Sequence, residues 1–74
     1  MKIILTDHTR ERMVLRKITE KMIKEAITDP DSTGVGYQGR SLVFKSFKVG
    51  VTMVVYTKEK DSYVIISVIW ESLK

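Results

Sequence analysis

The chain has 74 residues, of which 43% are apolar and 30% charged, with a net charge of +4 and no cysteine. These values are typical of an ordered globular protein and predict a single domain over residues 1–74, and they exclude disulfides and thiolate metal sites. No apolar run approaches the ~20 residues that cross a bilayer, so we expect no membrane partner. The absence of cysteine is compatible with a cytoplasmic location, which we expect.

The positive charge is unevenly distributed along the chain. Residues 1–24 contain seven Lys and Arg but only three acids, whereas residues 25–74 contain equal numbers of each. A localised basic region indicates an anionic partner, such as RNA or an acidic protein. The alternative is a solvated face that only keeps the protein soluble.

Two elements are predicted at the start of the chain. The β-branched apolar run Lys2–Thr6 is typical of a short strand. Thr6 and Asp7 are good N-caps, so we expect a helix from His8 to about Lys17.

The predicted helix 8–17 places three cationic side chains in one row. Because each helical residue turns about 100°, His8, Arg12 and Arg16 lie on successive turns of the same side. We call these three side chains the cationic stripe. It is the strongest functional signal in the sequence.

A second, amphipathic helix is expected to follow, with Thr19 as its N-cap and Glu20 in its first turn. Its apolar side chains share one face: Met22, Ile23, Ala26 and Ile27. The helix should end before Pro30, because the residue preceding a proline avoids the helical conformation.

Residues 32–40 contain three glycines and two hydroxyl side chains, which indicate either a loop or a weak edge strand. Their glycines match neither a dinucleotide-binding fingerprint nor a phosphate-binding P-loop, so no nucleotide cofactor is expected.

From residue 41 onward the chain is strand-like, with predicted strands over residues 41–48, 51–57 and 62–70 and a fraying end at residues 71–74. The last two runs are almost continuously apolar, which indicates burial on both faces, or burial on one face and a partner on the other. The predicted fold is α+β with the order β-α-α-β-β-β, in which two helices pack on one face of a mainly antiparallel sheet.

Metal and hydrolase sites find little support in the sequence. One histidine, no cysteine and the isolated Asp29 and Asp31 do not supply the ligand number or spacing of a zinc or calcium site. No nucleophile-elbow motif is present, so we do not expect a hydrolase with a nucleophilic serine. We expect neither a metal nor a cofactor.

Metal-independent cleavage of RNA fits the cationic residues better. Such cleavage needs an acid or base, for which imidazole is suited, and cations that neutralise the phosphate, for which guanidinium is suited. His8, Arg12, Arg16 and the more distant Arg40 would supply these groups. Three further residues would contact RNA, with the aromatic ring able to stack on a base: Arg10, Lys17 and Tyr37. Capping, solvation and loop anchoring are the structural alternatives for these side chains.

The chain also resembles a known family through several motifs. These are the run His8-x3-Arg12-Met13-x2-Arg16, the pair Gly39-Arg40 and the closing strand 66–70. Over roughly residues 4–70 they resemble domain-of-unknown-function family 4258, which is similar to the RelE/ParE-like and BrnT-like toxin fold. One departure is Lys17, which stands where a glycine is frequent between the helices.

The resemblance implies a RelE-toxin-like fold and places His8, Arg12, Arg16 and Arg40 at the family's polar positions. It also implies that Ser67 occupies a hydroxyl position of the last strand, where threonine is usual. We therefore expect a toxin-like RNA-binding protein with endoribonuclease activity. Its expected catalytic residues are His8, Arg12, Arg16, Arg40 and Ser67. The alternative is a non-catalytic interaction domain that binds an acidic antitoxin-like protein or a second copy of itself.

Overall fold

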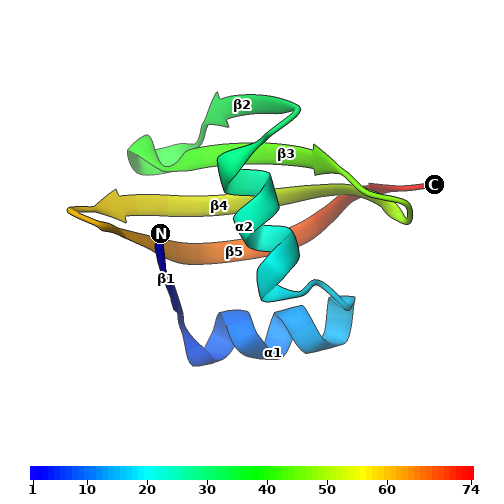
Figure 1. Cartoon of the computed structure of the whole chain (residues 1–74), viewed down its shortest axis with the longest axis horizontal. Helices are drawn as coiled ribbons and strands as arrows, with labels where there is room; N and C mark the ends of the chain where they lie inside the picture. Colours follow the sequence, from blue (N-terminus) through cyan, green and yellow to red (C-terminus); the bar gives the residue numbers. More distant parts are fainter.

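The computed structural model describes residues 1–74, which form five strands, two α-helices and a short 3-10 helix (Figure 1). In chain order the elements are β1 (Lys2–Leu5), α1 (Asp7–Arg16), α2 (Glu20–Thr28), β2 (Ser32–Val35), η1 (Tyr37–Gly39), β3 (Ser41–Ser46), β4 (Gly50–Glu59) and β5 (Ser62–Leu73).

The strands form one sheet in the order β1-β5-β4-β3-β2. The pairs β2–β3, β3–β4 and β4–β5 are antiparallel, and β1 pairs with β5 in parallel. The α+β class and the mainly antiparallel sheet are therefore confirmed. The glycine-rich segment 32–40, for which the sequence indicated either a loop or a weak edge strand, contains the strand β2. The sheet therefore has one strand more than the predicted order.

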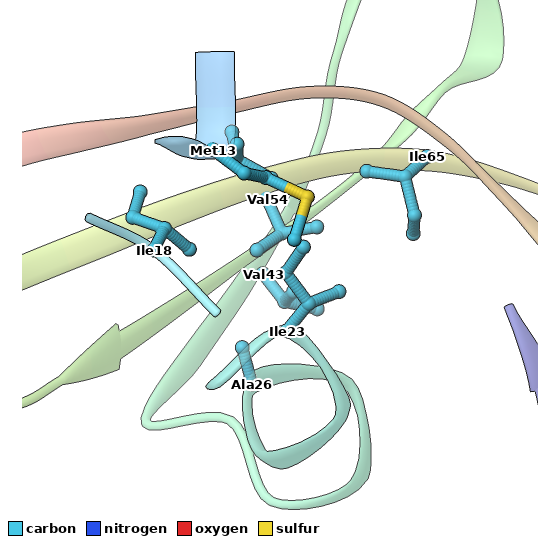
Figure 2. Packing of buried hydrophobic residues seen from close by; sticks show 8 residues of the cluster. Met13, Ile18, Ile23, Ala26, Val43, Val54 and Ile65 are labelled. Carbon is cyan, nitrogen blue, oxygen red and sulfur yellow. The ribbon is translucent and has the colours of Figure 1, made fainter. Parts of the chain in front are cut away.

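Helix α2 crosses one face of the sheet, in front of β3, β4 and β5 (Figure 1). Thr19 caps it as predicted, because the Thr19 side chain accepts a 3.2 Å hydrogen bond from the Met22 backbone N–H. Apolar side chains from both helices and three strands meet beneath α2 (Figure 2). They are Met13, Ile18, Ile23, Ala26, Val43, Val54, Ile65 and Val68.

Helix α1 lies along β5, below α2 in Figure 1. The reason is the short length of β1, which pairs only with Ser62–Ile65 at the beginning of β5. The chain then turns into α1, which follows the edge of β5 that β1 leaves free. Only one side of α1 is buried, through Thr9 and Met13.

The opposite sheet face has no helix packed on it, because α2 contacts the first face and α1 follows the β5 edge. The side chains of the central strands are thus buried on one face and half-buried on the other. The predicted fraying of residues 71–74 is wrong, since β5 continues to Leu73, which pairs with Gly50. A β-carbon at Gly50 would collide with the Ser72 carbonyl oxygen, so this close pairing requires glycine. Neither helix has the length and apolar content needed to cross a membrane.

Candidate functional site: a cationic groove between α1 and β5

Two hydroxyl groups, of the exposed Thr6 and the buried Thr9, attach the first turn of α1 to β5. Thr6 is the N-cap, and its hydroxyl accepts a 3.1 Å hydrogen bond from the Thr9 backbone N–H. The Thr6 hydroxyl in turn donates to the Thr9 hydroxyl at 2.9 Å, and Thr9 donates to the Ile65 carbonyl oxygen at 3.1 Å. Because Thr9 is only 1% exposed, its bond to Ile65 is shielded from water and fixes the N-terminal turn of the helix on the strand.

Two hydrogen bonds hold the other end of α1 on the same strand. The Arg16 Nη1 donates to the Val68 carbonyl oxygen at 3.4 Å, and the Trp70 Nε1 donates to the Arg16 carbonyl oxygen at 2.7 Å. Arg16 is therefore half-buried and positioned by β5, whereas His8 and Arg12 are exposed. The first two members of the stripe are free to move toward a ligand, and the third is held in place.

A β-bulge lies opposite the cationic stripe. Val55 on β4 pairs with Ser67, and Tyr56 pairs with Ile65, so Ile66 has no partner on β4. Bulges bend a strand and redirect its side chains, and they are frequent beside functional sites. Here the bulge lies at the point where β1 ends and α1 begins to follow β5.

A groove of about 230 Å³ forms between the stripe and the bulge. Its lining residues are His8, Thr9, Arg12, Arg16, Ile66, Ser67 and Val68. The structure thus brings together four of the five residues that were predicted as catalytic, from segments more than fifty positions apart. Arg40 is the one that does not line the groove.

The groove has a net positive character, since no carboxylate lines it. The ion pairs of the protein join Lys24 to Glu20, and Lys45 to Asp29 and Asp31. Arg12 and Arg16 take part in none of them. Both guanidinium groups therefore keep their charge available for an anion, and their planar forks match phosphate oxygens.

Arg40 lies between η1 and β3, on the far side of β4 from the groove. Two strand spacings of about 4.8 Å separate β3 from β5, so Arg40 is roughly 10 Å from the strand that lines the groove. Tyr37 lies on η1, beyond the end of β2 at the opposite edge of the sheet, and is 83% exposed. The structure therefore brings neither residue into the groove.

Arg10 and Lys17 line a different groove, of about 370 Å³, on the other flank of α1. Its remaining lining residues are Met13, Val14, Ile18 and Thr19. Lys17 ends α1 in the left-handed conformation, with φ 56° and ψ 40°, which explains why a glycine would suit this position. The two residues were predicted to bind RNA, and the structure separates them from the cationic stripe.

Sequence reasoning missed three lining residues of the cationic groove: Thr9, Ile66 and Val68. Thr9 could have been found, because it shares a helical side with Met13 and Arg16 and is a polar residue in a row that must face the sheet. The bulge at Ile66 could not have been found from the sequence, because it depends on how β5 pairs with β4. No group of three or more His, Cys, Asp or Glu residues is placed to hold a metal ion.

The family model described as "Domain of unknown function (DUF4258)" matches residues 5–70, which include every residue of the cationic groove. No curated protein and no solved structure matches the chain.

Proposed function

This chain belongs to the DUF4258 family of domains of unknown function, and we propose that it binds RNA and cleaves it without a metal ion. The observation that carries the proposal is the groove between α1 and β5, in which His8, Arg12, Arg16 and Ser67 meet without any carboxylate. Guanidinium and imidazole groups around a hollow of this size suit a phosphodiester, and RNA is the phosphodiester that carries its own nucleophile. A toxin-like role and a cytoplasmic location are parts of this proposal.

Each side chain has a distinct role in the proposed reaction. His8 accepts the proton of the ribose 2′-hydroxyl, whose oxygen attacks the adjacent phosphorus. The bond from phosphorus to the 5′-oxygen breaks, and this oxygen takes a proton from water. The products are a 2′,3′-cyclic phosphate and a 5′-hydroxyl end.

Arg12 and Arg16 neutralise the charge that develops on the phosphate oxygens. Arg16 is suited to positioning because β5 fixes it, whereas the exposed Arg12 can close on the phosphate after binding. Ser67 would donate a hydrogen bond to the same phosphate or to the ribose.

The decisive experiment is cleavage of a mixed-sequence RNA in excess EDTA by the wild type, His8→Ala and Arg10→Ala. We expect a cyclic-phosphate product with the wild type and with Arg10→Ala, whose altered side chain is on the other flank of α1. His8→Ala should bind RNA but not cleave it. A matched all-deoxy oligonucleotide, which lacks the 2′-hydroxyl, should be bound and left intact.

Two outcomes would contradict the proposal. Equal cleavage by wild type and His8→Ala would remove His8 from the reaction. Salt-dependent RNA binding without cleavage by any variant would reduce the function to a binding module.

A specific observation favours one second candidate, a non-catalytic domain that binds an acidic antitoxin-like protein. Val14 and Leu15 on α1 are 79% and 70% exposed, and Val14 lines the groove flanked by Arg10 and Lys17. Apolar side chains beside two cations suit an acidic amphipathic segment. If the wild type neither binds nor cleaves RNA, this candidate, or a homodimer, takes precedence.

A further inference from the structure

The sheet face turned away from α2 is the feature that carries a further inference. Along each strand the side chains alternate between the two faces, so the residues between the buried ones share this second face. In two adjacent rows across the sheet they are Leu42, Val55 and Ser67, then Phe44, Met53 and Ile69. We call these two rows the open face; none of its residues is fully buried.

The cationic groove lies at one margin of the open face. Ser67 belongs to both, since it pairs with Val55 in the open face and also lines the groove. Thr9, Met13 and Arg16 point from α1 toward β5 and the core. At 100° per residue, His8 and Arg12 lie on one flank of that row, and this is the flank that meets Ser67.

Arg40 lies at the β3 margin of the same face, one step along the strand beyond the Leu42 row. It immediately precedes Ser41, which pairs with Tyr56 on the face beneath α2, so strand alternation places Arg40 on the second face together with Leu42. Like the arginines of the groove, Arg40 takes part in no ion pair. The two rows between the margins contain no charged residue.

The open face therefore has cations at both margins and a neutral, largely apolar strip about 10 Å wide between them. This distribution is complementary to a single-stranded nucleic acid, whose phosphates carry charge and whose unstacked bases expose apolar rings. Phe44 on β3 lies on the Arg40 side of the strip, where it pairs with Met53 on the middle strand β4, and it supplies an aromatic ring for stacking. A duplex keeps its bases inside and would leave this strip without a partner.

Resting on the proposed RNA function, we propose that the substrate is single-stranded RNA that runs from the cationic groove across the open face to Arg40, with bases packed on the Leu42 row and on the adjacent Phe44 row. This path assigns Arg40 a role although it does not line the groove. It binds a phosphate distant from the cleaved bond and is a positioning residue.

Binding should be measured with a short unstructured oligonucleotide of 2′-O-methyl RNA, which lacks the nucleophile and so reports affinity without cleavage. We expect the wild type to bind it at least tenfold more tightly than a duplex of the same sequence. Phe44→Leu retains an apolar side chain but removes the aromatic ring, and it should weaken binding about tenfold. Arg40→Ala should weaken binding and lower its salt dependence, whereas Lys48→Ala, in the turn at the other end of β3, should not.

Met53→Lys tests the apolar strip in the opposite direction. If bases pack on the strip, the added cation cannot replace the lost contact with the bases, and the affinity for RNA should not rise. If the face binds phosphates only, the affinity for RNA should rise. Thermal unfolding of each variant checks that the fold is intact, and a variant that does not fold is replaced by Val55→Thr, which preserves side-chain shape and strand propensity.

Each remaining outcome overturns a different statement. Equal affinity for single strand and duplex overturns the path and leaves the groove function intact. The same conclusion follows if Phe44→Leu and Arg40→Ala both bind as the wild type does while Arg12→Ala loses affinity. No RNA binding by the wild type overturns both. A concentration-dependent dimer that Met53→Lys dissociates would assign the open face to a second copy.

Discussion

The Trp70 indole Nε1 donates a 2.7 Å hydrogen bond to the backbone carbonyl oxygen of Arg16. Carbonyl groups in the last turn of a helix have no partner within the helix, so Trp70 satisfies one of them from a neighbouring strand. The Arg16 guanidinium completes the junction by donating to Val68 on that strand. The direction of Arg16 in the groove therefore depends on where Trp70 holds the end of α1.

Trp70→Phe should separate this hydrogen bond from the packing of the ring. Phenylalanine retains most of the apolar contact but cannot donate, so we expect the free energy of unfolding to fall by about 1 kcal/mol. Circular dichroism in urea measures this change, because the substitution removes the only tryptophan and with it the fluorescence signal. Unchanged stability would show that water replaces the indole at the Arg16 carbonyl.

Thr9→Val should destabilise the protein more strongly. Valine has nearly the same shape, but the Ile65 carbonyl oxygen and the Thr6 hydroxyl would each lose a buried partner. The expected cost is about 1–3 kcal/mol in the free energy of unfolding. Thr9→Ser is the matched control, since it retains the hydroxyl and loses one methyl group, at a cost of about 0.8 kcal/mol. A valine variant as stable as the serine variant would contradict the role assigned to the hydroxyl.

These contacts show which parts of the structure were predictable. Local signals placed both helices well: Thr6 and Thr19 act as N-caps, and the apolar face of α2 packs on the sheet. The contacts of α1 with β5 join residues more than fifty positions apart, and no local pattern encodes them. The separation of Arg10 from Arg12 follows only once the buried side of α1 is known.

The sheet was predictable to a similar extent. Apolar and β-branched residues indicated β3, β4 and β5, but the sequence left two interpretations of the almost continuous apolar runs of β4 and β5 open. The structure shows one face covered by α2 and the other without a helix. Arg40 illustrates the limit, because its position two strands from the groove depends on strand order, which the composition of residues 32–40 does not determine.

Lys17→Gly should stabilise the protein. Lys17 adopts a left-handed conformation that costs a non-glycine residue about 1 kcal/mol. Glycine removes this cost, but its greater freedom in the unfolded chain offsets part of the gain in stability. We expect a net gain of about 0.5 kcal/mol, visible as a melting temperature raised by a few degrees. Lys17→Ala removes the same charge but keeps the strain, so it should not raise the melting temperature. Equal melting temperatures for the two variants would contradict this explanation.

Arg12→Ala and Arg10→Ala form a matched pair on opposite flanks of one helix. Both side chains are exposed and make no ion pair, so neither substitution should change the free energy of unfolding by more than about 0.5 kcal/mol. Only Arg12 lines the groove with His8 and Arg16, whereas Arg10 lines the groove on the other flank.

We therefore expect Arg12→Ala to weaken RNA binding about tenfold and to lower the slope of log affinity against log salt by about 1. Arg10→Ala should change both quantities much less. Fluorescence anisotropy across a salt series measures them together. Equal losses for the two variants would mean that RNA responds only to the total charge of α1, and the groove would then have no special role in binding.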